Sequence, residues 1–270
     1  MGKFDRVLLL TDLDGTLLDD QKKIGQKSRE AIAYFEQEGG HFSAATGRLH
    51  RFFRPSEYDL PLNCPALCAN GGYLYDYRTG ERACMHFLAE GFEDVVCDVL
   101  SRFPTVCAEY HTFSTTYLCR INDVSRHHME VMRITDPVTL DDPRQAPQEV
   151  IKVLFAAPAE EAKAISEYMQ DRPMKNFDFV FSTPVFYEML PAGVNKGDAA
   201  LGLCKYLGLD RKDLYTAGDN LNDLDLLKVA SIGFAPSNCH PTVASMPVNL
   251  LSDNNHDMMA DLIAFLDQKY

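Results

Sequence analysis

Residues 7–18 decide the fold of this chain and read VLLLTDLDGTLL. The opening residues are apolar at every position, which predicts a short strand, buried on both faces, at the centre of a parallel sheet. Side chains two apart in a strand share a face, so Asp12 and Asp14 are predicted to point the same way while Leu13 points back. Gly15 permits a sharp turn just past the strand end, where the ligands of open α/β sheets bind.

The two carboxylates indicate a reaction as well as a fold. Like charges this close repel each other, and a bound cation is the usual remedy. With a cation present, Asp12 is free to attack an electrophile and Asp14 to handle protons, which is typical of metal-assisted phosphoryl transfer. The same Asp-Leu-Asp-Gly sequence also fits a plain solvated turn, and the rest of the chain has to decide between the two.

The composition is that of an ordinary globular protein. Of 270 residues, 46% are hydrophobic and 24% are charged, which allows a large core and one or two domains. A net charge of −13 argues against nucleic acid and an anionic membrane surface as partners. No apolar stretch approaches the roughly 18 residues that a membrane span needs. No signal peptide opens the sequence, so we expect a cytoplasmic location.

Eight cysteines are scattered along the chain, mostly in apolar contexts. Cys64 and Cys68 are four residues apart, but no matching Cys or His pair completes a zinc pattern. A chain of this size does not need disulfides, so we expect reduced and mostly buried thiols.

Strands and helices alternate at both ends of the chain, with glycine or polar residues after the strands. Strands are predicted at 7–10, 41–45, 66–69, 214–217, 231–234 and 248–250. Helices are predicted at 28–38, where Ser28 is the expected N-cap, and at 196–207, 223–229 and 257–268. This order predicts an α/β fold with a doubly wound, mostly parallel sheet.

The middle of the chain has a different pattern of predicted helices and strands. Helices are predicted at 92–102 and 159–170, with strands at 105–109, 115–119, 150–156, 177–182 and 185–190. Prolines and polar residues make 134–149 a loop. We therefore predict a catalytic core built from 1–83 and 190–270, and an inserted α+β domain at 84–189.

Each predicted core strand is followed by a polar group of a different kind. Thr46 supplies a hydroxyl, and Gly47 lets a backbone N–H approach an anion closely. Lys196 begins a predicted helix, where its ammonium and the helix N-terminus both favour an anion. A second acidic cluster, Gly-Asp-Asn-Leu-Asn-Asp at 218–223, follows the strand at 214–217. Singly, each fits a turn, a solvated lysine or a helix cap; in this order at strand exits, they indicate one site.

These residues resemble the four motifs of the haloacid dehalogenase (HAD) superfamily, in its Cof-type branch of phosphatases with a C2-type cap between the second and third motifs. The matching segments are Asp12-Leu13-Asp14-Gly15-Thr16-Leu17, Thr46-Gly47-Arg48, Val194-Asn195-Lys196-Gly197 and Gly218-Asp219-Asn220-Leu221-Asn222-Asp223. Asn70-Gly71-Gly72 also resembles the step that leads towards the cap. One departure is Ala235-Pro236-Ser237-Asn238-Cys239, where such proteins usually read Ala-Met-Gly-Asn-Ala.

The resemblance implies a Rossmann-like core with assigned roles. Asp12 would attack phosphorus and form an aspartyl-phosphate. Asp14 would protonate the departing alcohol and later take a proton from the hydrolytic water. Mg²⁺ would be held by the Asp12 carboxylate, the Asp14 backbone carbonyl and Asp219. The phosphoryl oxygens would be held by Leu13, Thr46, Gly47, Lys196 and Asn222.

The same resemblance implies roles for two further residues that do not take part in the bond-making steps. Asp223 would orient Lys196 or a metal-bound water, and Arg48 is a candidate substrate contact. The middle domain would be a cap that closes over the site, excludes water and contacts the leaving group. Its candidate contacts are Tyr117, Arg120, His127 and His128.

The sequence thus predicts a Mg²⁺-dependent phosphatase whose partner is a small phosphorylated metabolite, with sugar phosphates the first candidates. A phosphomutase like the phosphomannomutases is the alternative, because those enzymes resemble this core and carry a similar cap. A non-catalytic, phosphate-sensing regulator is a third hypothesis, and the intact acidic residues and lysine of the motifs count against it.

Overall fold

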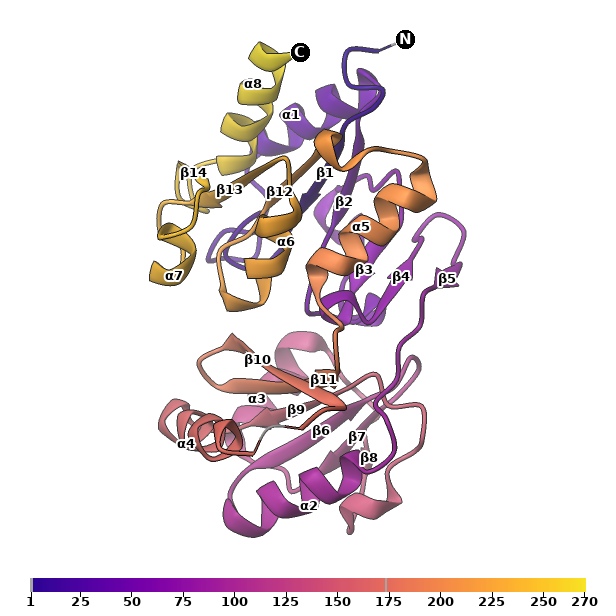
Figure 1. Ribbon diagram of the computed structural model, residues 1–270, viewed down its shortest axis with the longest axis vertical. Coiled ribbons are helices and arrows are strands. Elements are labelled where there is room, and N and C mark those ends of the chain that lie inside the picture. Colours follow the sequence, from indigo (N-terminus) through magenta and orange to yellow (C-terminus); the bar gives the residue numbers. More distant parts are fainter. Residues whose placement is uncertain (1, 173) are drawn as a thin grey trace. The chain divides into compact units, whose positions relative to one another are not determined.

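The computed structural model describes residues 2–172 and 174–270. The chain separates into two compact units, one made of Met1–Cys84 with Asn195–Tyr270 and the other of Met85–Val194. Each unit has its own main sheet (Figure 1). Each also has its own cluster of buried hydrophobic side chains. Across those described residues, no helix has both the length and the hydrophobicity required to cross a membrane.

A five-stranded parallel sheet forms the centre of the first unit, with the order β14-β13-β12-β1-β2. Its strands are β1 (Leu8–Thr11), β2 (His41–Ala44), β12 (Leu214–Ala217), β13 (Ile232–Pro236) and β14 (Asn249–Leu251). Strands from the two ends of the chain therefore lie side by side, with β1 between β2 and β12. This confirms the predicted α/β class and doubly wound parallel sheet.

Helices cover both faces of β1. Leu8 and Leu10 pack in one cluster with side chains of α5 and α6, and Leu9, which points the other way, is also fully buried. A strand buried on both faces explains why its sequence is uniformly apolar. The helices of this unit are α1 (Gln26–Gln37), α5 (Lys196–Leu207), α6 (Leu224–Val229), α7 (Pro241–Ala244) and α8 (Met258–Lys269).

The start of α1 differs from its prediction. The helix begins at Gln26 with Gly25 as N-cap, so the expected N-cap Ser28 lies inside the first turn. The backbone N–H of Ser28 donates to the Asp257 carboxylate at 2.9 Å. The acceptor that satisfies this helix end comes from the far end of the chain, which a local capping rule does not see.

The strand predicted at 66–69 is not one of the five strands of the parallel sheet. β3 (Ala66–Cys68) pairs antiparallel with β4 (Tyr73–Tyr75), which pairs with β5 (Arg82–Ala83). A single bridge between Ala45 and Leu67 ties β3 to the end of β2. Residues 69–71 all have positive φ, and this tight left-handed turn sends the chain straight back into β4.

The second unit has a six-stranded sheet with the order β10-β11-β9-β6-β7-β8. Its strands are β6 (Cys107–His111), β7 (Thr116–Cys119), β8 (Val138–Thr139), β9 (Lys152–Ala156), β10 (Phe177–Thr183) and β11 (Phe186–Pro191). Two helices, α2 (Phe92–Arg102) and α4 (Ala159–Gln170), pack on one face in a large apolar cluster. Residues of a third helix, α3 (Asp123–Met132), pack against a smaller cluster on alternate strand positions.

Helix α3 and strand β8 were not predicted. The α3 sequence is polar, and its clearest signal is a capping box between Asn122 and Ser125. The short strand β8 lies inside the predicted loop at 134–149 and has only two residues. Its pairing is parallel to β7, which depends on a neighbour distant in sequence rather than on its own pattern.

Candidate active site at the ends of β1 and β12

The predicted acidic residues meet where two neighbouring strands end. Asp12 follows β1, and Asp219 follows β12, which pairs with β1 in parallel. The backbone N–H of Asp12 donates to the Ala217 carbonyl at 2.8 Å, which continues the ladder between the two strand ends. Since the chain leaves β1 towards β2 on the opposite side, this is the topological switch point, where open α/β sheets bind ligands.

Lys196 links this edge to the third motif segment. Its Nζ lies 2.6 Å from Asp12 Oδ1 and 2.6 Å from Asp223 Oδ1. Lys196 and Asp223 are fully buried, where an unpaired charge would be costly. Burial alone would lower the pKa of Lys196, but the charges of Asp12 and Asp223 outweigh it and raise that pKa. The lysine therefore stays an ammonium directed at Asp12.

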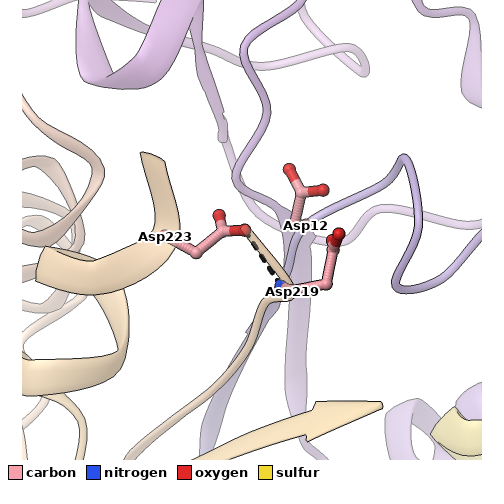
Figure 2. A group of neighbouring side chains, drawn as sticks. All are labelled: Asp12, Asp219 and Asp223. Carbon is pink, nitrogen blue, oxygen red and sulfur yellow. Dashed lines mark hydrogen bonds between the residues drawn. The ribbon is translucent and has the colours of Figure 1, made fainter. Parts of the chain in front are cut away.

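Both carboxylate oxygens of Asp223 accept hydrogen bonds from within the protein. One carboxylate oxygen pairs with Lys196, and the other accepts the backbone N–H groups of Asp219 and Asn220, both at 3.0 Å. Figure 2 shows the bond from the Asp219 nitrogen. Asp223 therefore fixes the loop after β12 and aligns Lys196, which is the geometry of an orienting residue.

Three carboxylates gather at this point. Oxygens of Asp12, Asp219 and Asp223 lie within 4.8 Å of one another (Figure 2). Burial, followed by repulsion from Asp223, raises the pKa of Asp219 to about 7. Burial also raises the pKa of Asp12 well above its ordinary value, against the opposing effect of Lys196. Thr16 donates its hydroxyl to Asp219 at 2.6 Å.

The donor set fits a hard divalent cation. Carboxylate oxygens are the ligands that Mg²⁺ and Ca²⁺ prefer, and close carboxylates with raised pKa values need positive charge between them. Asp223 already has three donors of its own, so Asp12 and Asp219 are the carboxylates that remain for an ion.

Asp14 has partners quite different from those of Asp12. β1 ends at Thr11, so both aspartates lie in the following loop and the alternation expected for a strand does not govern them. Arg48 approaches Asp14 with two nitrogens, at 2.7 and 2.5 Å, and Lys22 Nζ lies 2.8 Å away. Burial would raise the pKa of Asp14, but these two cations outweigh it and lower that pKa.

The second motif lies at the end of β2. Thr46 is buried, and its hydroxyl accepts the backbone N–H of Arg48 at 3.1 Å. The Arg48 guanidinium, expected to contact substrate, is instead engaged by Asp14 in this structure. Leu13 is fully buried, so any contact that it makes with a phosphoryl group would come from its backbone.

Residue-by-residue reasoning missed three contributors to this site. Thr16 binds Asp219, Lys22 binds Asp14, and Asn70 accepts the side-chain amide of Asn222 at 3.0 Å. Thr16 stands in the first motif, and Asn70 follows a strand exit like the other candidates, so both carried a usable signal. Lys22 carried none, because nothing local distinguishes it from a solvated lysine.

The loop that departs from the family pattern remains tied to the site. Asn238 donates its side-chain amide to Asn254 at 2.7 Å, and the N–H of His240 donates to the backbone carbonyl of Asp219 at 2.8 Å. The altered sequence therefore still supports the strand end that carries Asp219.

Comparison with known proteins agrees with this geometry. The family model of the haloacid dehalogenase-like hydrolases matches residues 9–263. The chain therefore belongs to the haloacid dehalogenase-like hydrolase family, and the prediction from its four motifs is confirmed. A haloacid dehalogenase-like hydrolase from Bacteroides thetaiotaomicron has the same fold, with a TM-score of 0.81, 21% identity, and 96% of this chain and 99% of that chain covered.

Several similar proteins are named as phosphatases. The 5-amino-6-(5-phospho-D-ribitylamino)uracil phosphatase YitU of Bacillus subtilis is 25% identical over 262 residues, 94% of each chain. The pyridoxal phosphate phosphatase YbhA of Escherichia coli is 26% identical over 272 residues, 96% of this chain and 97% of that one. The solved sugar phosphatase BT4131 of subclass IIB has a TM-score of 0.83 at 18% identity, covering 97% and 99%. The chain is a phosphoric monoester hydrolase.

Proposed function

We propose that this protein is a Mg²⁺-dependent phosphatase of small phosphorylated metabolites that works through an aspartyl-phosphate on Asp12. The observation that carries the proposal is the position of Asp12, at the end of β1 with a fully buried ammonium 2.6 Å from one carboxylate oxygen. Lys196 leaves the second oxygen of Asp12 to act as a nucleophile and places positive charge where phosphoryl oxygens would gather.

The phosphoryl group would be held by donors from four segments of the chain, one in each of the four motifs. We assign Thr46 and the backbone N–H groups of Leu13 and Gly47 to one side, and Lys196 and Asn222 to the other. Donors fixed in advance cost no reorganisation as charge shifts during transfer, which is how most phosphoryl-transfer enzymes gain rate.

The chemistry would proceed in two displacements. The Asp12 oxygen attacks phosphorus while the bond to the leaving alcohol breaks, and Asp14 gives that alcohol a proton. Water then attacks phosphorus, Asp14 takes its proton, and the bond to Asp12 breaks to release phosphate. Arg48 and Lys22 hold Asp14 as a carboxylate here. Before the first displacement, Asp14 must therefore exchange these partners for the reacting oxygen and take up a proton from solvent.

Asp12, Asp219 and the backbone carbonyl of Asp14 would hold Mg²⁺. When bound, the ion supplies positive charge that lets the carboxylates and the phosphate dianion share one site. Thr16 keeps the Asp219 carboxylate in one orientation by donating to it, and Asp223 fixes the Asp219 backbone. We assign both residues to the support of this cation site.

The inserted unit Met85–Val194 is assigned the role of a cap that selects the leaving group, and the remainder is assigned to catalysis. Substrate candidates follow from the named activities of similar proteins: phosphorylated sugars, phosphorylated ribityl compounds and pyridoxal phosphate. Sugar phosphates are the class we expect first.

The test is free-phosphate release from a panel of these compounds, measured with Mg²⁺ and with EDTA. Metal-dependent release from at least one compound is expected, and the ratio of kcat/KM values would rank the substrates. Conversion of a sugar phosphate to its isomer without free phosphate would replace the proposal with a phosphomutase. Binding of phosphorylated compounds without conversion would replace it with a regulator.

A further inference from the structure

Three consecutive residues beside the phosphate site have left-handed backbone conformations. Ala69, Asn70 and Gly71 have φ values of 52°, 57° and 95°, and we call them the left-handed strap. Only glycine adopts this region freely, asparagine tolerates it, and alanine is strained there. Such strain persists only where the surrounding structure holds it in place, and it is concentrated at functional sites.

The strap is bonded to the second motif on both sides of Gly47. The N–H of Asn70 donates to the Thr46 carbonyl at 3.0 Å, and the N–H of Ala69 donates to the Arg48 carbonyl at 2.9 Å. The Thr46 carbonyl and the Gly47 N–H belong to the same peptide unit, so the bond from Asn70 fixes the direction of that N–H, which we assign to the phosphoryl group. The bond from Ala69 holds the chain at the next peptide unit but one, after Arg48.

The other side of the strap lies against the third motif. A Cβ placed on Gly71 would be only 2.4 Å from the backbone oxygen of Asn195. The strap therefore packs in direct contact with the residue that precedes Lys196, and no side chain other than hydrogen fits between them.

The side chain of Asn70 reaches the fourth motif. It is almost completely buried, and its Oδ1 accepts the side-chain amide of Asn222 at 3.0 Å. A Cβ on Gly47 would lie 3.1 Å from the same Oδ1, so the Asn70 amide occupies the space beside Gly47. One side chain thus binds a side-chain donor of the phosphate site and lies beside the residue that carries a backbone donor.

We propose that Asn70 is a positioning residue of the phosphate site, which holds the Asn222 amide and the Gly47 N–H in register with Lys196. The identity of the anion rests on the function proposed above. Asparagine suits the position because it tolerates the left-handed backbone and carries a rigid acceptor of the right length. Alanine would lose both properties, and glutamine would lose the tolerance of the left-handed backbone.

The experiment compares Asn70→Gly, Asn222→Ala and their double variant with the wild type. Glycine keeps the left-handed backbone and removes only the amide, so it separates positioning from strain. Asp59→Gly is the matched control, since Asp59 is also left-handed with φ 48° and its side chain is 86% exposed. Each protein is assayed for the affinity of inorganic phosphate in the presence of Mg²⁺ by calorimetry, for kcat and KM, and for thermal stability.

We expect Asn70→Gly and Asn222→Ala each to weaken phosphate binding and kcat/KM by at least about tenfold. The double variant should lose clearly less than the product of the two single effects, because both remove the same hydrogen bond. The Asp59→Gly control should retain wild-type phosphate affinity. If Asn70→Gly does not fold, Asn70→Ser replaces it, because serine adds no charge and its short side chain does not reach Asn222 as the amide does; it should weaken phosphate binding by a similar factor.

Independent, multiplicative effects of the two variants would overturn the proposal, as would wild-type phosphate affinity in Asn70→Gly. A wild-type protein that binds no phosphate would overturn it too, because there would be no anion for Asn70 to organise. A wild-type protein that binds phosphate but releases none from any ester would contradict only the proposed hydrolysis, and the binding assay would still decide the role of Asn70.

Discussion

At the residue scale, the site is organised by one buried ammonium. Lys196 is held between Asp12 and Asp223 at 2.6 Å from each, and Asp223 in turn holds the loop that carries Asp219. Removing Lys196 would leave two buried carboxylates without their partner, which costs several kcal/mol. Conservative replacements that keep the shape of a side chain are therefore the informative ones.

Asp12→Asn is expected to abolish turnover while the protein stays folded. The amide has nearly the same shape but cannot form the acyl-phosphate bond, so phosphate release should fall by at least about a thousandfold. Lys196 keeps Asp223 as its partner, so circular dichroism and melting temperature should change little. Asp210→Asn, at an exposed surface position, is the control. Near wild-type release by Asp12→Asn would eliminate the covalent mechanism.

Asp219→Asn is expected to raise the Mg²⁺ requirement. Loss of one charged oxygen from the cation site should increase the Mg²⁺ concentration for half-maximal activity by roughly 10- to 100-fold. The measurement is a metal titration of phosphate release, with Asp225→Asn as control because Asp225 pairs with Lys228 near the surface. An unchanged titration would remove Asp219 from the cation site.

At the element scale, the position of α5 matters most, because Lys196 is its first residue. The helix approaches α6 closely at Gly197, where a Cβ would lie 2.5 Å from the backbone oxygen of Asp225. Further along the same helix, Gly202 has no atom within 4 Å of its Cβ position. The two glycines therefore have opposite roles: one permits helix contact, and the other only weakens the helix.

Gly197→Ala is expected to destabilise the protein by roughly 1–3 kcal/mol, because the added methyl must push α5 away from α6. The same shift should move Lys196 and lower kcat. Gly202→Ala is the matched control, and it should stabilise the helix by roughly 0.5–1 kcal/mol with activity unchanged. Urea unfolding and phosphate release measure both effects; equal stabilities of the two variants would contradict the close packing at Gly197.

At the scale of the whole molecule, each of the two units has its own set of buried charged side chains. In the second unit, the Glu109 carboxylate has one oxygen 2.8 Å from His128 Nδ1 and 3.5 Å from His111 Nε2. Among the residues described, its other oxygen is buried without a hydrogen-bond partner. A second buried ion pair, Lys152 with Glu188 at 2.8 Å, lies on the same sheet.

This unit is expected to lose stability in acid. Burial lowers the pKa of His111 from 6.5 to about 4, so between these values the unfolded chain binds a proton that the folded unit does not. The histidines outweigh burial and lower the pKa of Glu109 from 4.5 to about 2. The stability that the Glu109 carboxylate contributes is therefore lost as the pH falls from 4.5 towards 2. Each shift corresponds to roughly 3 kcal/mol.

Hydrogen exchange of the α2 and α4 amides, corrected for intrinsic rates, measures this loss between pH 7 and 4.5. Protection should fall over that range, and the fall should be smaller in His111→Gln, which cannot titrate. Equal protection at the two pH values in the wild type would contradict the prediction.

The sequence by itself determined the architecture and the order of the chemical groups. Hydrophobic periodicity and turn residues are local signals, so α2, α4, α5 and β12 begin and end where their patterns predicted. The same locality explains the failures. The acceptor at the start of α1 comes from Asp257, which is remote in sequence. The buried side chains of α3, Ser125 and His128, are polar, so hydrophobic residues do not mark them.

Only the tertiary structure decided which charged and polar groups became partners. Lys196 with Asp12, Asn222 with Asn70, and Arg48 with Asp14 join residues 184, 152 and 34 positions apart. A motif states that a lysine, an amide or a guanidinium is present at a strand end, but hydrogen bonds form only within about 3 Å. The packing of β1 between β2 and β12, with α5 across it, brings those distances about.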